Sequence, residues 1–414
     1  MNLNLPESIE GQAFVIAYLR ARLGLSVSEI ADATDKSEST INRRLKDAEA
    51  AGMLKQYIFT ANNEQREKFD SFLRDGKLEK DIVERIGNYR LQSAIVVPTV
   101  GDSAENREKV AKFAAARIME KTKYAISNGR DPKIGISWGR TLRAIVDSIN
   151  DIRCIEEALV EEKKSFGDKI DFSEVEVLPL CGDFWLNRER IPKGADIRDT
   201  QFCLGSRLAA DLADCLKAIP PLEMSIPASI PVEVADEPYY REIKRFLERS
   251  PAMERLYGGD NPLVSNLDGI ITSCGSFPRE IPKDDLSFHM ALRLRSGLIE
   301  ENTLEKLCNA GVIGDVLGLF ISGKESDGEK ESGRELDIVD KVNSSFLGPK
   351  LEHFRGVVNL ARKDPLRMGV IIVAAGESKS AILLEIINLE LVNEIIVDSS
   401  LARALMDKLS LADE

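Results

Sequence analysis

The stretch that decides the fold expected for most of this chain is Lys133-Ile-Gly-Ile-Ser-Trp-Gly-Arg-Thr-Leu142. It begins as a short buried β-strand that ends at Ser137, Gly139 permits a tight turn, and a helix opens at Thr141. A strand that leads through a glycine turn straight into a helix is typical of one unit of an α/β sheet.

Similar strand–helix units occur on both sides of this stretch. Apolar strand-like runs begin at Ala94, Val175, Asp268, Gly369 and Glu394, with helical stretches between or after them. Fully apolar strands that alternate with helices predict a mostly parallel sheet covered on both faces. We therefore expect an α/β fold, with a doubly wound, Rossmann-like domain over residues 91–414. Within it, the Pro-rich and then charged residues 219–262 form an excursion from the sheet, and residues 322–332 form an exposed loop.

Residues that directly follow the apolar runs are candidates for a binding site, because ligands of open parallel sheets bind beyond the carboxyl ends of the strands. The quoted stretch offers two hydroxyls, a glycine turn and an arginine at a helix start, a combination that favours an anion. Elsewhere, an acid could accept hydrogen bonds from sugar hydroxyls, and a lysine or arginine could bind a phosphate. The candidates are Ser137, Gly139, Arg140, Thr141, Gly275, Ser276, Arg295, Asp315 and Lys379.

These candidates make a geometric prediction. Since each segment follows an apolar strand, Thr141, Asp315 and Lys379 should project from the same edge of one parallel sheet and border a common cavity. The alternative for each segment is an ordinary turn whose charged side chains are solvated.

The first sixty residues have a different pattern, with two short capped helices. Ser26 and Glu29 form a capping-box pair before one helix, and Ser37 caps the next, which ends at Gly52. Two short helices joined by a tight turn, followed by a short strand or wing over Met53–Phe59, match a winged helix-turn-helix. The polar side chains of the second helix would contact double-stranded DNA: Ser37, Ser39, Thr40, Asn42, Arg43 and Lys46.

A helical hairpin with a solvated polar face is the alternative for this segment. Residues 1–60 hold seven Lys/Arg against eight Asp/Glu, and the whole chain has a formal charge of −13. Non-specific binders of nucleic acid are usually basic. We therefore expect modest DNA affinity per subunit and a homo-oligomer, a dimer or a tetramer, that engages more than one half-site. Residues 61–90 form a charged, helical linker between residues 1–60 and the large domain.

Composition excludes several other classes of protein. The two histidines, His289 and His353, argue against a zinc site or a histidine triad, and the six cysteines include no CxxC pair, so we expect no metal and no cofactor. No apolar run reaches the length of a membrane span and the N-terminus does not read as a signal peptide, so we expect a cytoplasmic protein with reduced thiols.

Taken together, the chain resembles the SorC family of sugar-binding transcriptional regulators over nearly its whole length. The resemblance is most specific at Gly135–Leu142, at Arg295-Ser-Gly-Leu followed by Gly311–Gly318, and at Gly376–Lys379 with the segment from Leu391 to Leu405. It implies a sugar or sugar-phosphate effector, a sugar-phosphate-isomerase-like fold and no catalysis. It also implies that Gly139, Arg140 and Thr141 bind phosphate, with Asp315, Lys379 and Arg295 as further contacts.

The chain departs from the family pattern at Cys181, where relatives that sense a bisphosphate sugar carry an arginine. Two other classes of function stay open at this stage. A sugar-phosphate isomerase or deaminase of the same fold would need a positioned general base, for which Asp315 or Glu377 is available, although histidine is scarce. An interaction protein without a ligand would have a pocket filled with apolar side chains.

Overall fold

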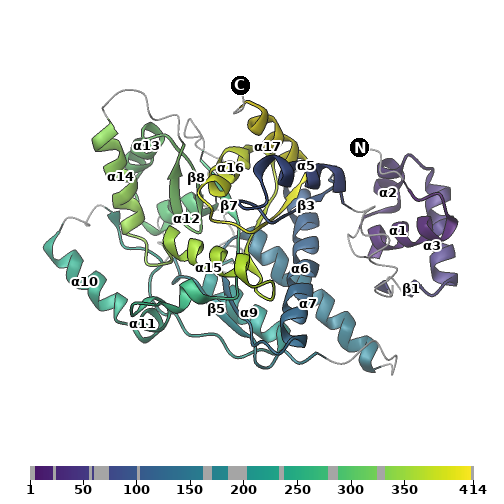
Figure 1. Ribbon diagram of the computed structural model, residues 1–414, viewed down its shortest axis with the longest axis horizontal. Helices are drawn as coiled ribbons and strands as arrows, with labels where there is room; N and C mark the ends of the chain where they lie inside the picture. The colour runs from purple at the N-terminus through teal and green to yellow at the C-terminus, as the bar shows by residue number, and fades with distance from the viewer. Residues whose placement is uncertain are drawn as a thin grey trace.

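The computed structural model describes residues 5–21, 25–55, 58–59, 74–99, 103–161, 170–184, 203–232, 237–277, 288–323 and 332–411. The charged segment 61–73 of the predicted linker, and most of the loop predicted over 322–332, lie outside these residues. Figure 1 shows a small N-terminal unit beside a larger α/β body, and the two differ in secondary structure as the sequence predicts.

The N-terminal unit is a winged helix-turn-helix. Its elements are α1 (Ile9–Ala21), α2 (Val27–Thr34), α3 (Glu38–Ala50) and the antiparallel strands β1 (Leu54–Lys55) and β2 (Ile58–Phe59). Both predicted caps are present, since Ser26 and Glu29 form a capping box and the Ser37 hydroxyl accepts a hydrogen bond from the Thr40 amide. Phe14, Ile30 and Ile41 are fully buried between the helices, so a small apolar core sets their packing.

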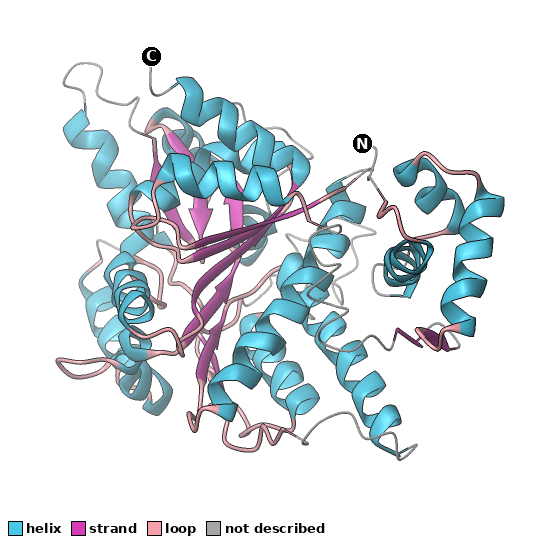
Figure 2. Ribbon diagram, turned by 45° about the vertical axis from the view of Figure 1, so that its right-hand side comes forward, coloured by secondary structure: helices cyan, strands magenta, loops and turns pink. Residues whose placement is uncertain are grey.

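The larger body is built on a six-stranded parallel sheet with the order β3-β11-β10-β6-β4-β5 (Figure 2). Its strands are β3 (Ser93–Val97), β4 (Lys133–Ile136), β5 (Glu176–Pro179), β6 (Gly269–Thr272), β10 (Gly369–Ala374) and β11 (Glu394–Asp398). The predicted doubly wound, mostly parallel α/β fold is confirmed.

Helices cover both faces of this sheet. One face carries α6 (Ser103–Ser127), α7 (Arg140–Glu161) and α9 (Gly205–Leu216). The other carries α5 (Gly76–Ile86), α15 (Leu351–Lys363), α16 (Ser380–Asn388) and α17 (Ser399–Leu411). Alternate strand residues pack into two separate cores, for example Ile396 on the α6 face and Ile395 on the opposite face.

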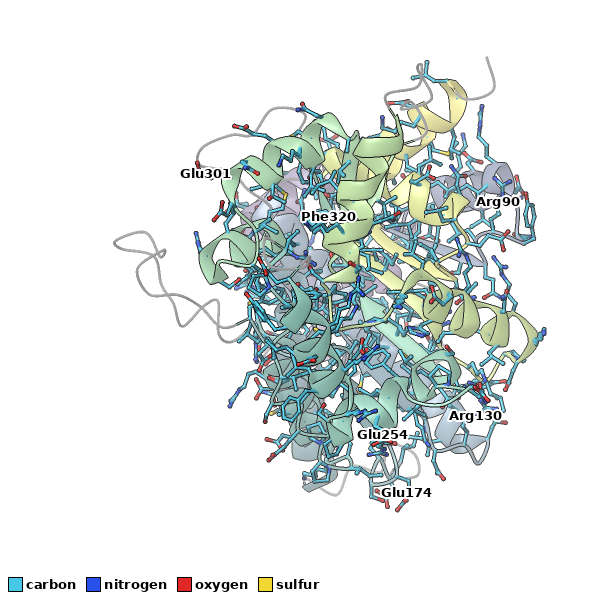
Figure 3. All side chains as sticks on the ribbon, turned by 90° about the vertical axis from the view of Figure 1, so that its left-hand side faces the viewer. Arg90, Arg130, Glu174, Glu254, Glu301 and Phe320 are labelled. Atoms are coloured by element: carbon cyan, nitrogen blue, oxygen red, sulfur yellow. The ribbon has the colours of Figure 1, made fainter. Side chains whose placement is uncertain are left out.

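A second, antiparallel sheet and its helices form a lobe that the sequence does not predict. It contains β7 (Cys274–Ser276), β8 (Val312–Val316) and β9 (Leu319–Ser322), with α12 (Phe288–Ser296), α13 (Glu301–Asn309) and α14 (Ser332–Ser344). Phe320, which Figure 3 labels, lies in the apolar core of this lobe. The excursion over 219–262 contributes α10 (Pro238–Glu248) and α11 (Pro251–Tyr257), followed by a short 3-10 helix (Leu263–Asn266).

The lobe corrects one prediction. Asp315 does not follow a strand of the parallel sheet; it lies within β8, the middle strand of the antiparallel sheet. The reason is a two-residue turn in which Leu317 and Gly318 both have positive φ, so that the chain returns as β9 instead of crossing to a helix.

Candidate functional site

The loop after β4 closes tightly onto its neighbours. The Ser137 hydroxyl is buried 3.0 Å from the Thr272 hydroxyl at the end of the adjacent strand β6. Gly139 has a φ of 125°, a conformation that strongly favours glycine, and its amide donates to the Cys203 carbonyl at 2.9 Å. Helix α7 then begins at Arg140, so its first turn lies at the carboxyl edge of the sheet, with Thr141 buried and Arg140 exposed.

Lys379 lies at the same edge, at the end of a 3-10 turn (Glu377–Lys379) that follows β10. Burial lowers the pKa of its ammonium group, and the positive charges of Arg107 and Arg140 lower it further, while Cys274 and Asp398 act in the opposite direction. These groups therefore come close enough to interact electrostatically although they are distant in the sequence. The Ser378 hydroxyl is 3.5 Å from that of Ser276, which brings the β10 turn beside β7.

Asp315 faces β7 directly, since it pairs with Gly275 across the antiparallel sheet. Close approach of the two strands requires glycine at 314, because a side chain there would run into the Gly275 carbonyl oxygen and Ile382. Asp315 is 6% exposed, and its carboxylate accepts a hydrogen bond from the Gly318 amide at 3.4 Å. Burial raises the pKa of the Cys274 thiol to about 11, and the negative charge of Asp315 contributes to the rise.

Arg293 is the residue of this site that sequence reasoning missed. Its side chain is fully buried, donates to the Gly318 carbonyl at 2.8 Å and lies over the Phe320 ring at 5.1 Å. Burial lowers its pKa to about 10, and Asp315 and Cys181 oppose that change. Arg295, the predicted residue, is partly exposed on the same helix, and no recorded contact among the described residues joins it to this cluster. Residues two apart on a helix point in nearly opposite directions. The apolar residues of α12 do not single out Arg293 in the sequence, because Leu292 stands three residues before Arg295 just as Met290 stands three residues before Arg293.

Aromatic side chains line the region between β4 and this lobe. The Trp138 ring packs edge-on against Phe184 at 5.2 Å and against Phe346 at 5.7 Å. Phe346 in turn lies 5.8 Å from the Arg293 guanidinium. Cys181, where the family pattern would have an arginine, is buried, and the positive charge of Arg293 acts on its thiol. A guanidinium from α12 thus lies near the position at which the expected arginine is missing.

The structure brings together most of the predicted ligand contacts. The charge of Arg140 acts on Lys379, and the charges of Lys379 and Asp315 both act on Cys274. Gly275 pairs with Asp315 and Ser276 lies beside Ser378, while Ser137, Gly139 and Thr141 share the loop that precedes or opens α7. A cavity of about 200 Å³ among the described residues lies at the other edge of the sheet, lined by Arg130, Pro132, Ser173 and their neighbours. This cavity does not border Thr141, Asp315 or Lys379, so it gives no support to their predicted common cavity.

The predicted DNA-contacting residues all lie on α3 or at its start. Asn42, Arg43 and Lys46 are exposed. The hydroxyls of Ser37, Ser39 and Thr40 form a network at the helix N-terminus, with distances of 2.9 Å and 3.0 Å from Ser37. Arg44 has a different role, because it bonds to Gln12 of α1 and to Asp47 and so fixes α3 on its support.

Helix α6 contacts the winged helix-turn-helix and the candidate ligand site at once. Tyr18 of α1 packs near Phe113 of α6, with ring centroids 6.3 Å apart. One turn earlier on α6, Lys109 pairs with Glu105 at 2.8 Å. Hydrogen bonds from Ser26 lower the pKa of the Glu29 carboxyl on α2, and the positive charge of Lys109 lowers it further. On the same part of α6, the side-chain amide of Asn106 donates a hydrogen bond to the carboxylate of Asp398, at the end of β11, at 3.2 Å.

Within the described ranges, no helix is long and apolar enough to cross a membrane. No group of three or more His, Cys, Asp or Glu side chains in that part of the chain is placed to hold a metal ion.

Comparison with known proteins supports two functional segments. Residues 15–55 match the family described as "Winged helix-turn-helix DNA-binding", and residues 70–174 match the family described as "Putative sugar-binding domain". No curated protein matches the chain in sequence.

Solved structures of transcriptional regulators share the fold. The full-length sorbitol operon regulator SorC from Klebsiella pneumoniae superimposes with a TM-score of 0.50 at 17% identity, covering 96% of this chain and 99% of that one. A DeoR-family transcriptional regulator from Listeria monocytogenes gives a TM-score of 0.52 at 20% identity, covering 80% of this chain and 98% of that one. The chain thus combines a winged helix-turn-helix DNA-binding segment with a sugar-binding domain in the fold of the SorC- and DeoR-family transcriptional regulators.

Proposed function

We propose that this protein is a transcriptional regulator whose binding to operator DNA is controlled by a small sugar or sugar phosphate. The observation that carries the proposal is the double contact of α6. Phe113 packs near Tyr18 of the winged helix-turn-helix and the charge of Lys109 acts on Glu29 there, while Asn106 bonds to Asp398 at the ligand edge of the sheet. A ligand that moves the start of α6 would therefore change the support of the DNA-binding helices.

The proposed effector site comprises Ser137, Gly139, Arg140, Thr141, Gly275, Ser276, Asp315 and Lys379, and we add Arg293 to this set in place of Arg295. The first turn of α7, Arg140 and Lys379 supply N–H donors and positive charge for a phosphate. Asp315 accepts hydrogen bonds from sugar hydroxyls. No histidine is among the residues proposed for the site, and we propose that they bind the effector without converting it to a product.

We propose a separate role for each of three consecutive segments of the chain. Residues 1–60 bind double-stranded DNA, residues 61–90 connect this segment to the larger body and contribute α5 to one face of its sheet, and residues 91–414 bind the effector. Because the DNA-binding segment carries no excess of positive charge, we propose that the protein works as a homo-oligomer that engages more than one half-site.

A thermal-shift screen of the full chain against a panel of sugars and sugar phosphates tests effector binding. A ligand at a hundredfold its Kd adds about 2.7 kcal/mol to the free energy of unfolding. A stabilising compound whose effect is lost in Lys379→Ala supports the proposed site. Conversion of that compound to a product would favour an enzyme instead.

A further inference from the structure

Helix α10 exposes a stripe of large apolar side chains. Tyr239, Ile243 and Phe246 are 51%, 45% and 78% exposed, and their spacing places them on one face of the helix. Single exposed apolar residues are common on protein surfaces, but three on one helical face form a patch of the kind that partners cover.

The helix is fixed to the body by the face next to this stripe. Tyr240 is buried, Leu247 packs against the core, and the Lys244 ammonium donates to the Ser344 carbonyl at 2.8 Å. The anchoring residues Tyr240, Lys244 and Leu247 each come one position after a residue of the exposed stripe. The anchoring face therefore lies beside the stripe on the helix surface. The exposed stripe therefore cannot turn inward without breaking these contacts.

Charge on this helix indicates what covers the stripe. Glu242 and Arg249 lie seven residues apart, on the flank of the stripe that faces away from the body, and are exposed. Among the described residues, neither side chain has a recorded hydrogen bond or ion pair. When two copies of such a helix run antiparallel about a two-fold axis, the acid of each copy meets the base of the other. The axis then passes between residues 245 and 246, beside Phe246.

We propose that α10 is a contact between two copies of this chain, in which the two helices pack antiparallel through Phe246 and Ile243 and form two reciprocal Glu242–Arg249 ion pairs. Stable protein interfaces bury about 1,200–2,000 Å² in total, and a single pair of three-turn helices buries less. The association is therefore weak and depends on concentration.

The position of α10 in the molecule determines how far apart the contact places the two DNA-binding units. It lies at the end of the molecule opposite to α1, α2 and α3 (Figure 1), on the side that faces the viewer in Figure 3. A contact there does not bring two DNA-binding units onto adjacent half-sites. It instead joins subunits whose DNA-binding units are far apart, as is needed to link two separate DNA sites.

Sedimentation velocity of the full chain over a range of concentrations tests the contact. Phe246→Asp should remove one association step, so that the mass at high concentration halves, while the melting temperature stays unchanged because residue 246 is largely exposed. Glu242→Arg and Arg249→Glu should each weaken that step by roughly three- to tenfold, and the double variant should restore it.

Two outcomes would overturn the proposal. The first is an association that Phe246→Asp leaves intact, which would leave the stripe to a different protein or a lipid surface. The second is a double variant that associates no better than either single variant. Affinity for a short duplex, recovered by the protein from a random pool, should be the same in wild type and Phe246→Asp. That comparison separates failure of this contact from failure of the DNA-binding function.

Discussion

The ring of Tyr18 in the DNA-binding unit lies 6.3 Å from the ring of Phe113 in α6, at a tilt of 50°. The two residues come from segments that match different families, so this contact joins the segment similar to winged helix-turn-helix DNA-binding units to the segment similar to sugar-binding domains. Asn106 on the same helix bonds to Asp398 at the ligand edge of the sheet. Asn106 and Phe113 are seven residues apart, so two turns of α6 separate the ligand edge from the contact with the DNA-binding unit.

Phe113→Ala should uncouple the two functions. Effectors commonly change the affinity of a regulator by about 5- to 150-fold, and removal of the joining contact should bring this factor close to one. The measurement is DNA affinity by fluorescence anisotropy with and without the stabilising compound. Tyr124→Ala is the matched control, because Tyr124 is an exposed aromatic residue of the same helix. An effector response that survives in Phe113→Ala would exclude this route of coupling.

Substitutions on α3 should reduce DNA binding alone. Asn42→Ala and Arg43→Ala remove exposed side chains that can read base edges, at about 1–3 kcal/mol each for a good bidentate contact. Glu49→Ala, which changes another exposed residue of the same helix, should not weaken binding. Calorimetry should show that effector binding is unchanged in all three proteins. Unaltered DNA affinity in both test variants would remove α3 from consideration as the recognition helix.

Residues of the proposed effector site should contribute separately to affinity. Lys379→Ala and Asp315→Asn each remove a charged hydrogen-bonding group, which costs about 1.5–3 kcal/mol and raises Kd roughly ten- to hundredfold. We choose asparagine at 315 because the side chain is buried next to Arg293 and must keep its volume. Lys363→Ala, an exposed lysine on α15, is the control. Equal Kd values for all four proteins would mean that the effector binds elsewhere.

The buried carboxylate of Glu394 should anchor α6 to the sheet. It accepts bonds from Arg117 at 2.9 Å and Lys121 at 3.0 Å, and although burial alone would raise its pKa, these two cations lower it. Glu394→Gln should therefore reduce the free energy of unfolding by about 1.5–3 kcal/mol at neutral pH. Glu120→Gln, which removes the exposed partner of Arg117, should cost less than about 1 kcal/mol.

The lowered pKa of Glu394 predicts how the stability difference between wild type and Glu394→Gln changes with pH. A carboxylate whose pKa is lower in the folded than in the unfolded state stabilises the fold above the unfolded pKa, about 4.3 for glutamate. That contribution is lost as the pH decreases through the folded pKa. Denaturant titrations of wild type and Glu394→Gln should therefore converge in acid. A difference in stability that grows as the pH decreases would contradict the assigned role of the ion pair.

The sequence predicts the elements whose signal is local. The caps at Ser26 and Ser37, the wing after Met53 and the parallel strands all follow from periodicity, capping and turn residues, and the structure contains each of them. The turn at Gly139 is equally local, since a positive φ selects glycine.

The antiparallel lobe could not be predicted in the same way. Val312–Val316 has the apolar character of a parallel strand, and only the turn at Leu317 and Gly318 sends it back as a hairpin. Leucine rarely adopts a positive φ, so the sequence signal for this turn is weak. Arg293 was missed because arginine is usually exposed, and what keeps it buried is a carbonyl and two aromatic rings from distant segments.

The central claim is that one small molecule controls the affinity of this protein for DNA. The most direct test is a titration of the full chain into a labelled duplex, recovered by the protein from a random pool, with and without the compound that stabilises it. The account predicts that the compound changes DNA affinity at least fivefold in the wild type and does not change it in Lys379→Ala. A compound that stabilises the protein through the wild-type site and leaves DNA affinity unaltered would contradict the account.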